Sequence, residues 1–424
     1  MKQATFAAAF DSQLKWCSKI RDEMERRGII CRIVVPNIRN ALSPRQIADV
    51  GISHVEPVTW QEMISIALNS DIFISSLSGP TTKRISIELA HHAKESGARS
   101  PVLVAGWVGV IIEKLVAGYL DRIGCDLIAV NSKSDWDRFH NVANILDLPI
   151  DNLIMTGLPF TSNLVTPQRN GAIKSVLFAD QPTVPAAPNE RLYIYKRLIE
   201  YAKSHPDRSV ILKPRHRPDE DTFHKMKHHP EELLSGIERP PNFKIDYTSI
   251  TDVLPAIDLL LTMSSTAAIE GIAAGCRVGL ILDLGVHEKY GNPVFLESGL
   301  LRTFEAIEAD DIGSPCQKWI SEFFPMLSEP PAKIIVNRAI SLIDRDVRPS
   351  DLVRQTSYFK GASEFHFSAE KLKRELNKRK STPFADRLRT YSPAKRMFVR
   401  FWERVLPDVV ATPIYGFLRR KGYL

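Results

Sequence analysis

Cysteine is scarce in this 424-residue chain and forms no pattern. The five cysteines are odd in number and far apart: Cys17, Cys31, Cys125, Cys276 and Cys316. The absence of a C-x-x-C pair argues against a disulfide framework and against a cysteine-based zinc site. The sequence therefore predicts a protein of the reducing cytoplasm.

Long hydrophobic segments are also missing. Residues 1–10 contain one lysine and an apolar run too short for a signal peptide, so we interpret them as a first buried strand. The longest apolar stretch, residues 102–120, is interrupted by Glu113 and Lys114. We therefore expect no membrane-spanning segment.

The net charge of +7 comes from the end of the chain. Residues 361–424 contain 15 Lys and Arg against 6 Asp and Glu, whereas residues 1–360 contain 41 against 43. Between residues 385 and 406, aromatic and apolar residues are interspersed with arginines, a pattern typical of helices on acidic membrane surfaces. A basic helix packed on the body of the protein fits the same pattern. No nucleic-acid-binding motif accompanies the charge, and we expect no nucleic-acid partner.

Two series of predicted strands, most of them short apolar runs, alternate with segments of helical periodicity. The first series comprises residues 5–10, 29–35, 72–75, 101–105, 127–131 and 153–156, and the second comprises residues 175–178, 209–212, 244–247, 259–262 and 278–282. Continuous apolar strands between helices predict parallel sheets with both faces covered.

We therefore predict an α/β fold with two doubly wound, Rossmann-like domains and a basic helical tail. The domains span residues 1–160 and 172–345, and the tail spans residues 361–424. In such a fold the carboxyl ends of the strands of both sheets face one cleft. Polar residues that directly follow a strand are thus the candidates for a binding or catalytic site.

Three hydroxyl residues, Ser264, Ser265 and Thr266, separate the predicted strand 259–262 from a predicted helix. Hydroxyls and backbone N–H groups at a helix N-terminus, aided by the helix dipole, form a site for phosphate. Glu270, one turn later, is placed to accept hydrogen bonds from ribose hydroxyls. Plain N-capping by one serine is the alternative. Capping uses one hydroxyl and not three, which favours the phosphate site.

Four basic residues follow the predicted strand 209–212, in the segment Lys213-Pro214-Arg215-His216-Arg217-Pro218. Lys213 and Arg215 point into the predicted cleft and can neutralise a nucleotide phosphate. His216 can donate to a phosphoryl oxygen or act as an acid near neutral pH. A solvated basic loop is the alternative. We interpret the downstream histidines, on a predicted helix at residues 219–228 and just after it, as a solvated face without a metal.

Asp11 ends the first predicted strand and begins a helix. It could serve as general base for an acceptor hydroxyl, although capping of the helix by Asp11 or Ser12 is an equal alternative. Two glycine-bearing turns follow other strands, and Trp107 in one of them offers a flat face for a sugar. The chain has no G-x-G-x-x-G fingerprint and no Walker A loop, which argues against a dinucleotide or P-loop site.

The two halves and their motifs resemble a glycosyltransferase of the GT-B type. Lys213-Pro214-Arg215-His216 and Ser264-Ser265-Thr266 are similar to the HP and SS motifs of bacterial sialyltransferases and polysialyltransferases, although Arg217 separates His216 from Pro218. Residues 5–330 resemble a family of uncharacterised bacterial glycosyltransferases. The shared segments are Asp11-Ser12-x-Leu14-Lys15-Trp16, Ser264-Ser265-Thr266-Ala267-Ala268-Ile269-Glu270, Asp283-x-Gly285-Val286 and Glu297-Ser298-Gly299-Leu300.

This resemblance implies a metal-independent glycosyltransferase that needs no cofactor. Its donor would be a nucleotide sugar, CMP-linked sialic acid or a related keto-sugar acid, and its acceptor a cell-surface glycan or a lipid-linked sugar. The N-terminal domain would bind the acceptor, with Asp11 as catalytic base, and the C-terminal domain the donor, with His216 as the second catalytic residue. The other residues expected to bind the donor are Lys213, Arg215, Ser264, Ser265, Thr266 and Glu270.

We expect this enzyme in the cytoplasm, peripheral at the inner face of the plasma membrane where the tail binds lipid. Three alternatives stay open on the sequence. They are a transferase of UDP-sugars or CDP-polyols for a surface polymer, a non-catalytic sugar-nucleotide or polysaccharide-binding protein, and an epimerase of similar two-domain form.

Overall fold

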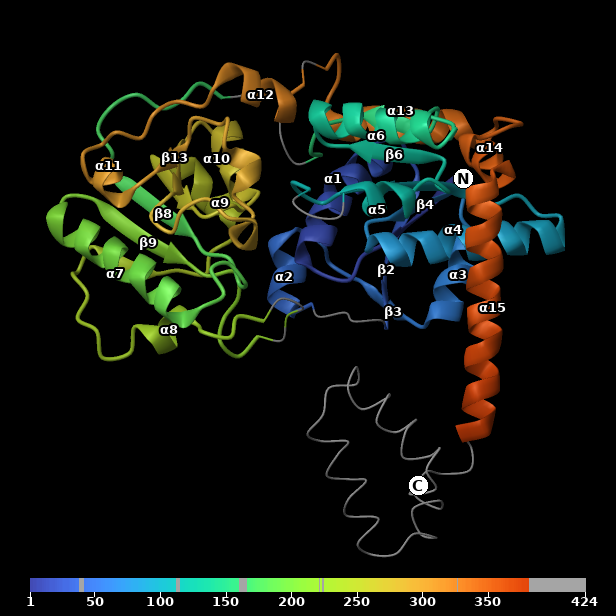
Figure 1. The fold of residues 1–424 in the computed structure, drawn as a ribbon, viewed down its shortest axis with the longest axis horizontal. Helices are drawn as coiled ribbons and strands as arrows, with labels where there is room; N and C mark the ends of the chain where they lie inside the picture. The colour runs from blue at the N-terminus through green and yellow to red at the C-terminus, as the bar shows by residue number, and fades with distance from the viewer. Residues whose placement is uncertain are drawn as a thin grey trace, which may run out of the picture. The chain divides into compact units, whose positions relative to one another are not determined.

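Figure 1 shows the computed structural model, which describes residues 1–37, 42–111, 115–159, 166–220, 222, 225–325 and 327–380, with side chains up to residue 375. The chain divides into two units, Met1–Phe359 and Lys360–Leu424. The first unit contains two α/β domains, each built on a parallel sheet.

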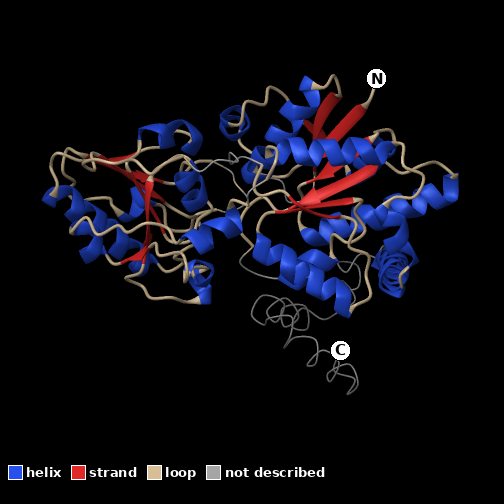
Figure 2. Ribbon diagram, turned by 90° about the horizontal axis from the view of Figure 1, so that it is seen from above, coloured by secondary structure: helices blue, strands red, loops and turns tan. Residues whose placement is uncertain are grey.

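The N-terminal sheet has seven parallel strands in the order β3-β2-β1-β4-β5-β6-β7. They are β1 (Gln3–Ala7), β2 (Ile30–Pro36), β3 (Glu56–Val58), β4 (Ile72–Ser75), β5 (Val102–Gly106), β6 (Leu127–Val130) and β7 (Leu153–Met155). The helices are α1 (Asp11–Arg26), α2 (Pro44–Asp49), α3 (Trp60–Leu68), α4 (Gly79–Ser96), α5 (Leu115–Leu120) and α6 (Lys133–Ile145). Every residue of β4, β5 and β6 is buried, because helices cover both faces of the sheet (Figure 2).

The C-terminal sheet has six parallel strands in the order β10-β9-β8-β11-β12-β13. They are β8 (Ser175–Ala179), β9 (Ser209–Lys213), β10 (Phe243–Ile245), β11 (Leu259–Thr262), β12 (Arg277–Ile281) and β13 (Leu301–Arg302). The helices are α7 (Pro188–Ser204), α8 (Pro230–Leu233), α9 (Ile250–Val253), α10 (Ala267–Ala273), α11 (Phe304–Glu308) and α12 (Gln317–Phe323), with short 3-10 turns at Leu254–Ala256, Glu288–Tyr290 and Pro293–Phe295.

Both sheets are doubly wound, which confirms the predicted fold. The strand order reverses beside the first strand of each sheet, between β1 and β4 and between β8 and β11. In open parallel sheets, ligands bind outside the carboxyl ends of the strands at such reversal points. The loops after β1 and β11, and the loop after β9, carry most of the residues that the sequence singled out.

The chain returns to the N-terminal domain after α12. Helix α13 (Pro331–Ile343) buries an apolar stripe in the core that α1 and the N-terminal sheet form: Ala332, Ile335, Val336, Ala339, Leu342 and Ile343. Arg348 then donates to the carbonyls of Leu342, Ile343 and Ser100, before α14 (Pro349–Gln355). The predicted end of the second domain at residue 345 is therefore corrected, because α13 and α14 belong to the N-terminal domain.

A second correction concerns residues 219–228, where we predicted a helix. The described residues of this segment are not helical, and α8 begins only at Pro230. The Glu220 carboxylate accepts from the Arg217 backbone N–H at 2.8 Å, which closes a turn in place of a helix start. His229 caps α8 by accepting from the Glu231 N–H.

The second unit is described only through residue 380, within α15 (Ser357–Lys380). Phe365 and Leu372, two turns apart on this helix, are both exposed. The predicted amphipathic stretch at residues 385–406 lies outside the described residues. No helix in the described ranges combines the length and the apolar character that crossing a membrane requires.

Candidate functional site

The carboxyl ends of the two sheets meet at four charged side chains. Asp11 begins α1 after β1, and Lys15 lies one turn further along the same helix. From the C-terminal domain, Arg215 donates two hydrogen bonds to Asp11, at 2.9 Å from Nε and 2.5 Å from Nη2. Lys15 Nζ lies 2.5 Å from Oε2 of Glu270 in α10. The structure thus brings together three predicted site residues, Asp11, Arg215 and Glu270, and adds Lys15 as a fourth.

Two glycines set how closely the N-terminal loops approach this site. A Cβ atom at Gly106, the end of β5, would lie 2.7 Å from Cζ2 of the buried Trp16, so the Trp16 ring of α1 packs against β5 at a distance that a larger residue would disturb. A side chain at Gly109 would lie 2.6 Å from Thr266 Oγ1 in the other domain. The neighbouring Val110 N–H donates to the same oxygen at 3.4 Å. The position of α1, which carries Asp11, thus depends on the close contact of Gly106 with Trp16. The position of the β5 loop depends on the close contact of Gly109 with Thr266.

Lys213 ends β9 with a side chain that is almost fully buried, at 9% exposure. Burial, followed by the charge of nearby Arg45, lowers the pKa of its ammonium to about 8. Within the described part of the chain, Lys213 has no ion pair, whereas Arg215 and Lys15 each have one. Such a buried cation is suited to an anionic ligand, which would offset the cost of its burial.

His216 is buried and both ring nitrogens have protein partners. Nε2 accepts from the Met226 N–H at 3.0 Å, so the proton is assigned to Nδ1, which donates to the Arg217 carbonyl at 2.8 Å. The carbonyl of His216 is in turn within 3.1 Å of His229 Nε2. In this conformation no nitrogen is left for a phosphoryl oxygen. In this conformation His216 supports its loop, and its predicted role as a phosphate donor or acid stays a prediction that requires exchange of one of these partners.

The three hydroxyl residues lie at the end of β11 as predicted, and each has a partner in the protein. Ser264 donates to the Tyr290 carbonyl, and its N–H donates to Gln181 Oε1 at 2.9 Å. Ser265 Oγ accepts from the Ala267 N–H at 3.2 Å, which is the capping role weighed as the alternative. Thr266 accepts from Val110. Their predicted binding of phosphate stays a prediction, and it requires exchange of at least one of these partners.

Gln181, which the sequence did not single out, follows β8 and contacts Ser264, which follows β11, at the reversal point of the C-terminal sheet. Its carbonyl accepts from Arg191, whose Nη1 lies 3.0 Å from both oxygens of Asp180. Tyr195 completes this buried group by donating to Asp180 at 2.6 Å. Burial raises the pKa of Asp180 to about 6, although Arg191 acts in the opposite direction. The pair of Asp180 and Arg191 holds the Gln181 loop beside Ser264.

Trp107 does not provide the sugar-stacking face that the sequence indicated. Its ring stacks on Phe139 with a centroid distance of 4.9 Å, and the Arg122 guanidinium lies over it at 4.4 Å. Asn131 fixes the turn by donating to the carbonyls of Trp107 and Gly109. Trp107 therefore packs the β5 loop.

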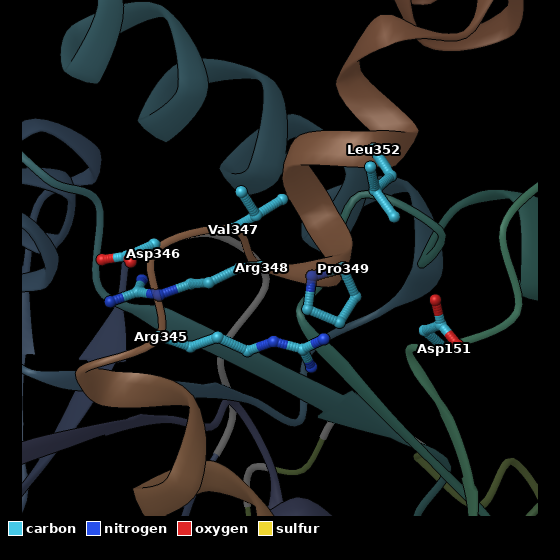
Figure 3. Close-up of a pocket in the computed structure, with 7 residues that line it drawn as sticks. All are labelled: Asp151, Arg345, Asp346, Val347, Arg348, Pro349 and Leu352. Atoms are coloured by element: carbon cyan, nitrogen blue, oxygen red, sulfur yellow. The ribbon is translucent and has the colours of Figure 1, made fainter.

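The pocket shown in Figure 3 lies away from these residues. It has a volume of about 290 Å³ and lies beside the turn between α13 and α14, lined in part by Asp151, Arg345 and Leu352. Within the described ranges, no three His, Cys, Asp or Glu side chains are arranged to hold a metal ion.

The fold matches solved structures of sugar-nucleotide enzymes. One, described as a "putative UDP-N-acetylglucosamine 2-epimerase" from Listeria monocytogenes, has a TM-score of 0.52 and 12% identity over 83% of this chain and 99% of its own. Another, UDP-GlcNAc 2-epimerase of Methanocaldococcus jannaschii in complex with UDP-GlcNAc and UDP, has a TM-score of 0.51 and 11% identity over 80% and 100%. At this identity the likeness shows the fold alone, and it confirms the GT-B-type pairing of two Rossmann-like domains. A comparison with curated proteins gives no match.

A family model matches residues 5–333, which include nearly all of both sheets and all four charged residues of the site. This range agrees with the extent of the resemblance predicted from the sequence, residues 5–330. The similarity to sialyltransferase motifs is not tested by these comparisons and stays a prediction. The chain belongs to the family described as "Putative glycosyltransferase (DUF6716)".

Proposed function

We propose that the protein transfers a sugar from a nucleotide-sugar donor to a glycan or lipid-linked acceptor, at the site between Asp11 and Arg215. The observation that carries this proposal is the direct pairing of these two residues. It puts a carboxylate of one domain and a cation of the other at the meeting point of two doubly wound sheets, in a chain of a glycosyltransferase family. Carboxylate and cation are the two groups that glycosyl transfer requires, one for the acceptor proton and one for the leaving phosphate.

The proposed reaction uses both groups in one step. Phosphate oxygens of the donor replace the Asp11 carboxylate on Arg215, which leaves Asp11 to accept the proton of the acceptor hydroxyl. The acceptor oxygen bonds to the anomeric carbon, and the bond from that carbon to the phosphate oxygen breaks. The nucleotide leaves with the electron pair, and Arg215 and Lys213 balance its charge, so the proposal includes no metal. Glu270 would accept from the ribose once Lys15 releases it.

For the donor we propose CMP-linked sialic acid or a related keto-sugar acid. The support is the similarity of the segments at residues 213–216 and 264–266 to sialyltransferase motifs; the occupied ring of His216 does not add to it. UDP-sugars and CDP-polyols are the alternative donors. A thermal-shift comparison of CMP, UDP, GDP and CDP conjugates separates them, because the true donor class stabilises the folded protein by mass action. Stabilisation by UDP conjugates alone would overturn the proposal of a CMP-linked donor, but it would still agree with a glycosyltransferase.

Binding of the donor is expected to take up a proton at pH 8 through Lys213. With a pKa of about 8, half of the Lys213 side chains are neutral at that pH, and a bound anion favours the ammonium and raises its pKa. Uptake is therefore about half a proton at pH 8 and declines towards pH 6, where Lys213 is already charged, while affinity falls as the pH rises above 8. Titration calorimetry in two buffers of different ionisation enthalpy measures this uptake.

The matched variants for this experiment are Lys213→Met and Lys174→Met. The first removes the buried ammonium and is expected to abolish the uptake. The second replaces an exposed lysine that precedes β8 and should behave as the wild type. Equal proton uptake by Lys213→Met and the wild type would show that Lys213 is not in contact with the donor phosphate.

We further propose that the basic tail holds the enzyme at the membrane surface where lipid-linked acceptors occur. The support is the charge of residues 361–424 and the aromatic residues among their arginines. Deletion of residues 385–424 is expected to lower binding to phosphatidylglycerol-containing vesicles at least about tenfold, with little change on pure phosphatidylcholine. Sedimentation with vesicles measures this, and equal binding of the truncated and full chains would contradict it.

A further inference from the structure

A second bidentate ion pair joins the two domains beside the site. Arg45 of α2, in the N-terminal domain, donates from Nε and Nη2 to the two carboxylate oxygens of Glu220, both at 2.7 Å. Glu220 lies in the loop that follows β9, and its side chain is only 10% exposed. The residues are 175 positions apart in the sequence. Neither belongs to the motifs that the sequence singled out.

Glu220 anchors its own loop as well as α2. Besides Arg45, it accepts from the Ser43 hydroxyl at 3.0 Å and from the Arg217 N–H at 2.8 Å. Burial acts to raise the pKa of Glu220, but its hydrogen bonds from Arg45 and Arg217 hold it at about 2. The carboxylate is thus ionised and saturated with donors. Two of them come from the N-terminal domain and one from the basic segment that contains Arg215.

Arg45 also reaches a second loop of the C-terminal domain. Its Nη1 donates to the Tyr247 carbonyl, after β10, at 3.4 Å, and to Asp49 of its own helix at 2.7 Å. The guanidinium is close enough to Lys213 to lower the pKa of that ammonium. Arg45 therefore lies beside the carboxyl ends of both β9 and β10 and next to the buried cation of the site.

This arrangement differs from an ordinary surface ion pair. Arg32 and Glu56 form a comparable two-bond pair, but they connect neighbouring strands β2 and β3 of one sheet and are more exposed. Such exposed pairs contribute little to stability. Arg45 and Glu220 instead bridge separately folded sheets, and one partner is tied to the backbone of the donor-binding loop.

We infer that Arg45 and Glu220 form an interdomain clasp that positions the basic loop, residues 213–217, for the donor, so that the donor site is complete only when α2 is seated on the C-terminal domain. Both are positioning residues, and their role rests on the proposed function of that loop. When the pair of Arg45 and Glu220 opens, the turn from Arg217 to Glu220 is no longer held against α2. Lys213 and Arg215, which precede this turn, then lose their fixed orientation. The clasp thus couples domain closure to donor binding.

The clasp is tested by hydrogen–deuterium exchange without ligand, followed by kinetics with the donor that the wild type uses. Arg45→Met is expected to speed exchange across residues 213–220 at least about tenfold, because the loop loses its tether to the other domain. It should also raise the donor KM at least about tenfold with kcat nearly unchanged, as expected when binding alone is weakened. Arg45→Lys keeps the positive charge but cannot make the two parallel hydrogen bonds of the guanidinium. It should therefore bring the exchange rate and the donor KM part of the way back to the wild-type values. Glu220→Gln should act like Arg45→Met.

Arg32→Met is the matched control, because it breaks a bidentate pair within one domain. It should leave the exchange of residues 213–220 and the donor KM as in the wild type. Wild-type exchange and KM in both Arg45→Met and Glu220→Gln would overturn the clasp. A wild-type enzyme that turns over no nucleotide sugar would instead refute the proposed function, and the exchange comparison would still decide whether the clasp exists.

Discussion

Asp11→Asn is expected to lower kcat about 10²- to 10⁴-fold, the usual contribution of a general base. The amide cannot take the proton of the acceptor hydroxyl, and it keeps nearly the same shape at the start of α1. Nucleotide binding should be retained or become tighter, because the wild-type carboxylate competes with phosphate for Arg215. Steady-state kinetics and nucleotide titration on the same variant measure the two effects.

Asp22→Asn is the control for this substitution. Asp22 lies on the same helix, is partly exposed and pairs with Arg21, away from the site. It should have wild-type kinetics. If Asp11→Asn retains kcat within about threefold of the wild type, the residue only begins α1 and pairs with Arg215, and another group must accept the proton.

Arg215→Met is expected to lower kcat/KM about 10²- to 10³-fold, as found when one donor to a developing oxyanion is removed. Arg215→Lys should recover only part of this loss, because an ammonium cannot make the two parallel hydrogen bonds that the guanidinium makes to Asp11. Nucleotide affinity should weaken in both variants. The measurement is kcat/KM for the donor together with the dissociation constant of the free nucleotide.

The neighbouring Arg217 provides the control. Its side chain is exposed and lies over the Tyr247 ring at 5.3 Å, so Arg217→Met removes one positive charge from the same loop without removing a partner of Asp11. It should cost less than about threefold in kcat/KM. Equal losses for both variants would mean that the site uses the general charge of the loop and not a specific contact of Arg215.

The sequence predicted the architecture well because both sheets are buried on both faces. Runs such as residues 259–261 and 101–105 are apolar throughout, which is the pattern of parallel strands between helices. The sequence did not assign α13 to the correct domain. The apolar stripe of Ala332, Ile335 and Ala339 predicts a helix with one buried face, but it does not indicate which domain covers that face. The domain assignment of such a helix is decided by packing between distant segments.

The sequence predicted individual residues of the site, and the structure showed which of them pair with one another. Asp11, Arg215 and Glu270 were expected at the carboxyl ends of strands, but that Arg215 pairs with Asp11 follows only from the seating of one domain on the other. His216 Nε2 accepts from the backbone N–H of Met226, ten residues away. The sequence predicted a helix in the segment that contains Met226, so this contact was not expected. Arg45 lies on the short helix α2, whose capping box of Ser43 and Gln46 marks a helix start but does not indicate a partner in the other domain.

The most direct test of the proposed function is a transfer assay with the purified full chain, in which CMP-, UDP-, GDP- and CDP-linked sugars are each offered with membrane and polysaccharide extracts. We predict that one nucleotide class supports acceptor-dependent release of free nucleotide, with one sugar added to an acceptor per nucleotide released. Asp11→Asn and Arg215→Met should each slow this release and the transfer at least about 10²-fold. Epimerised donor formed without any acceptor, or no binding and no release with all four classes, would contradict the proposed function.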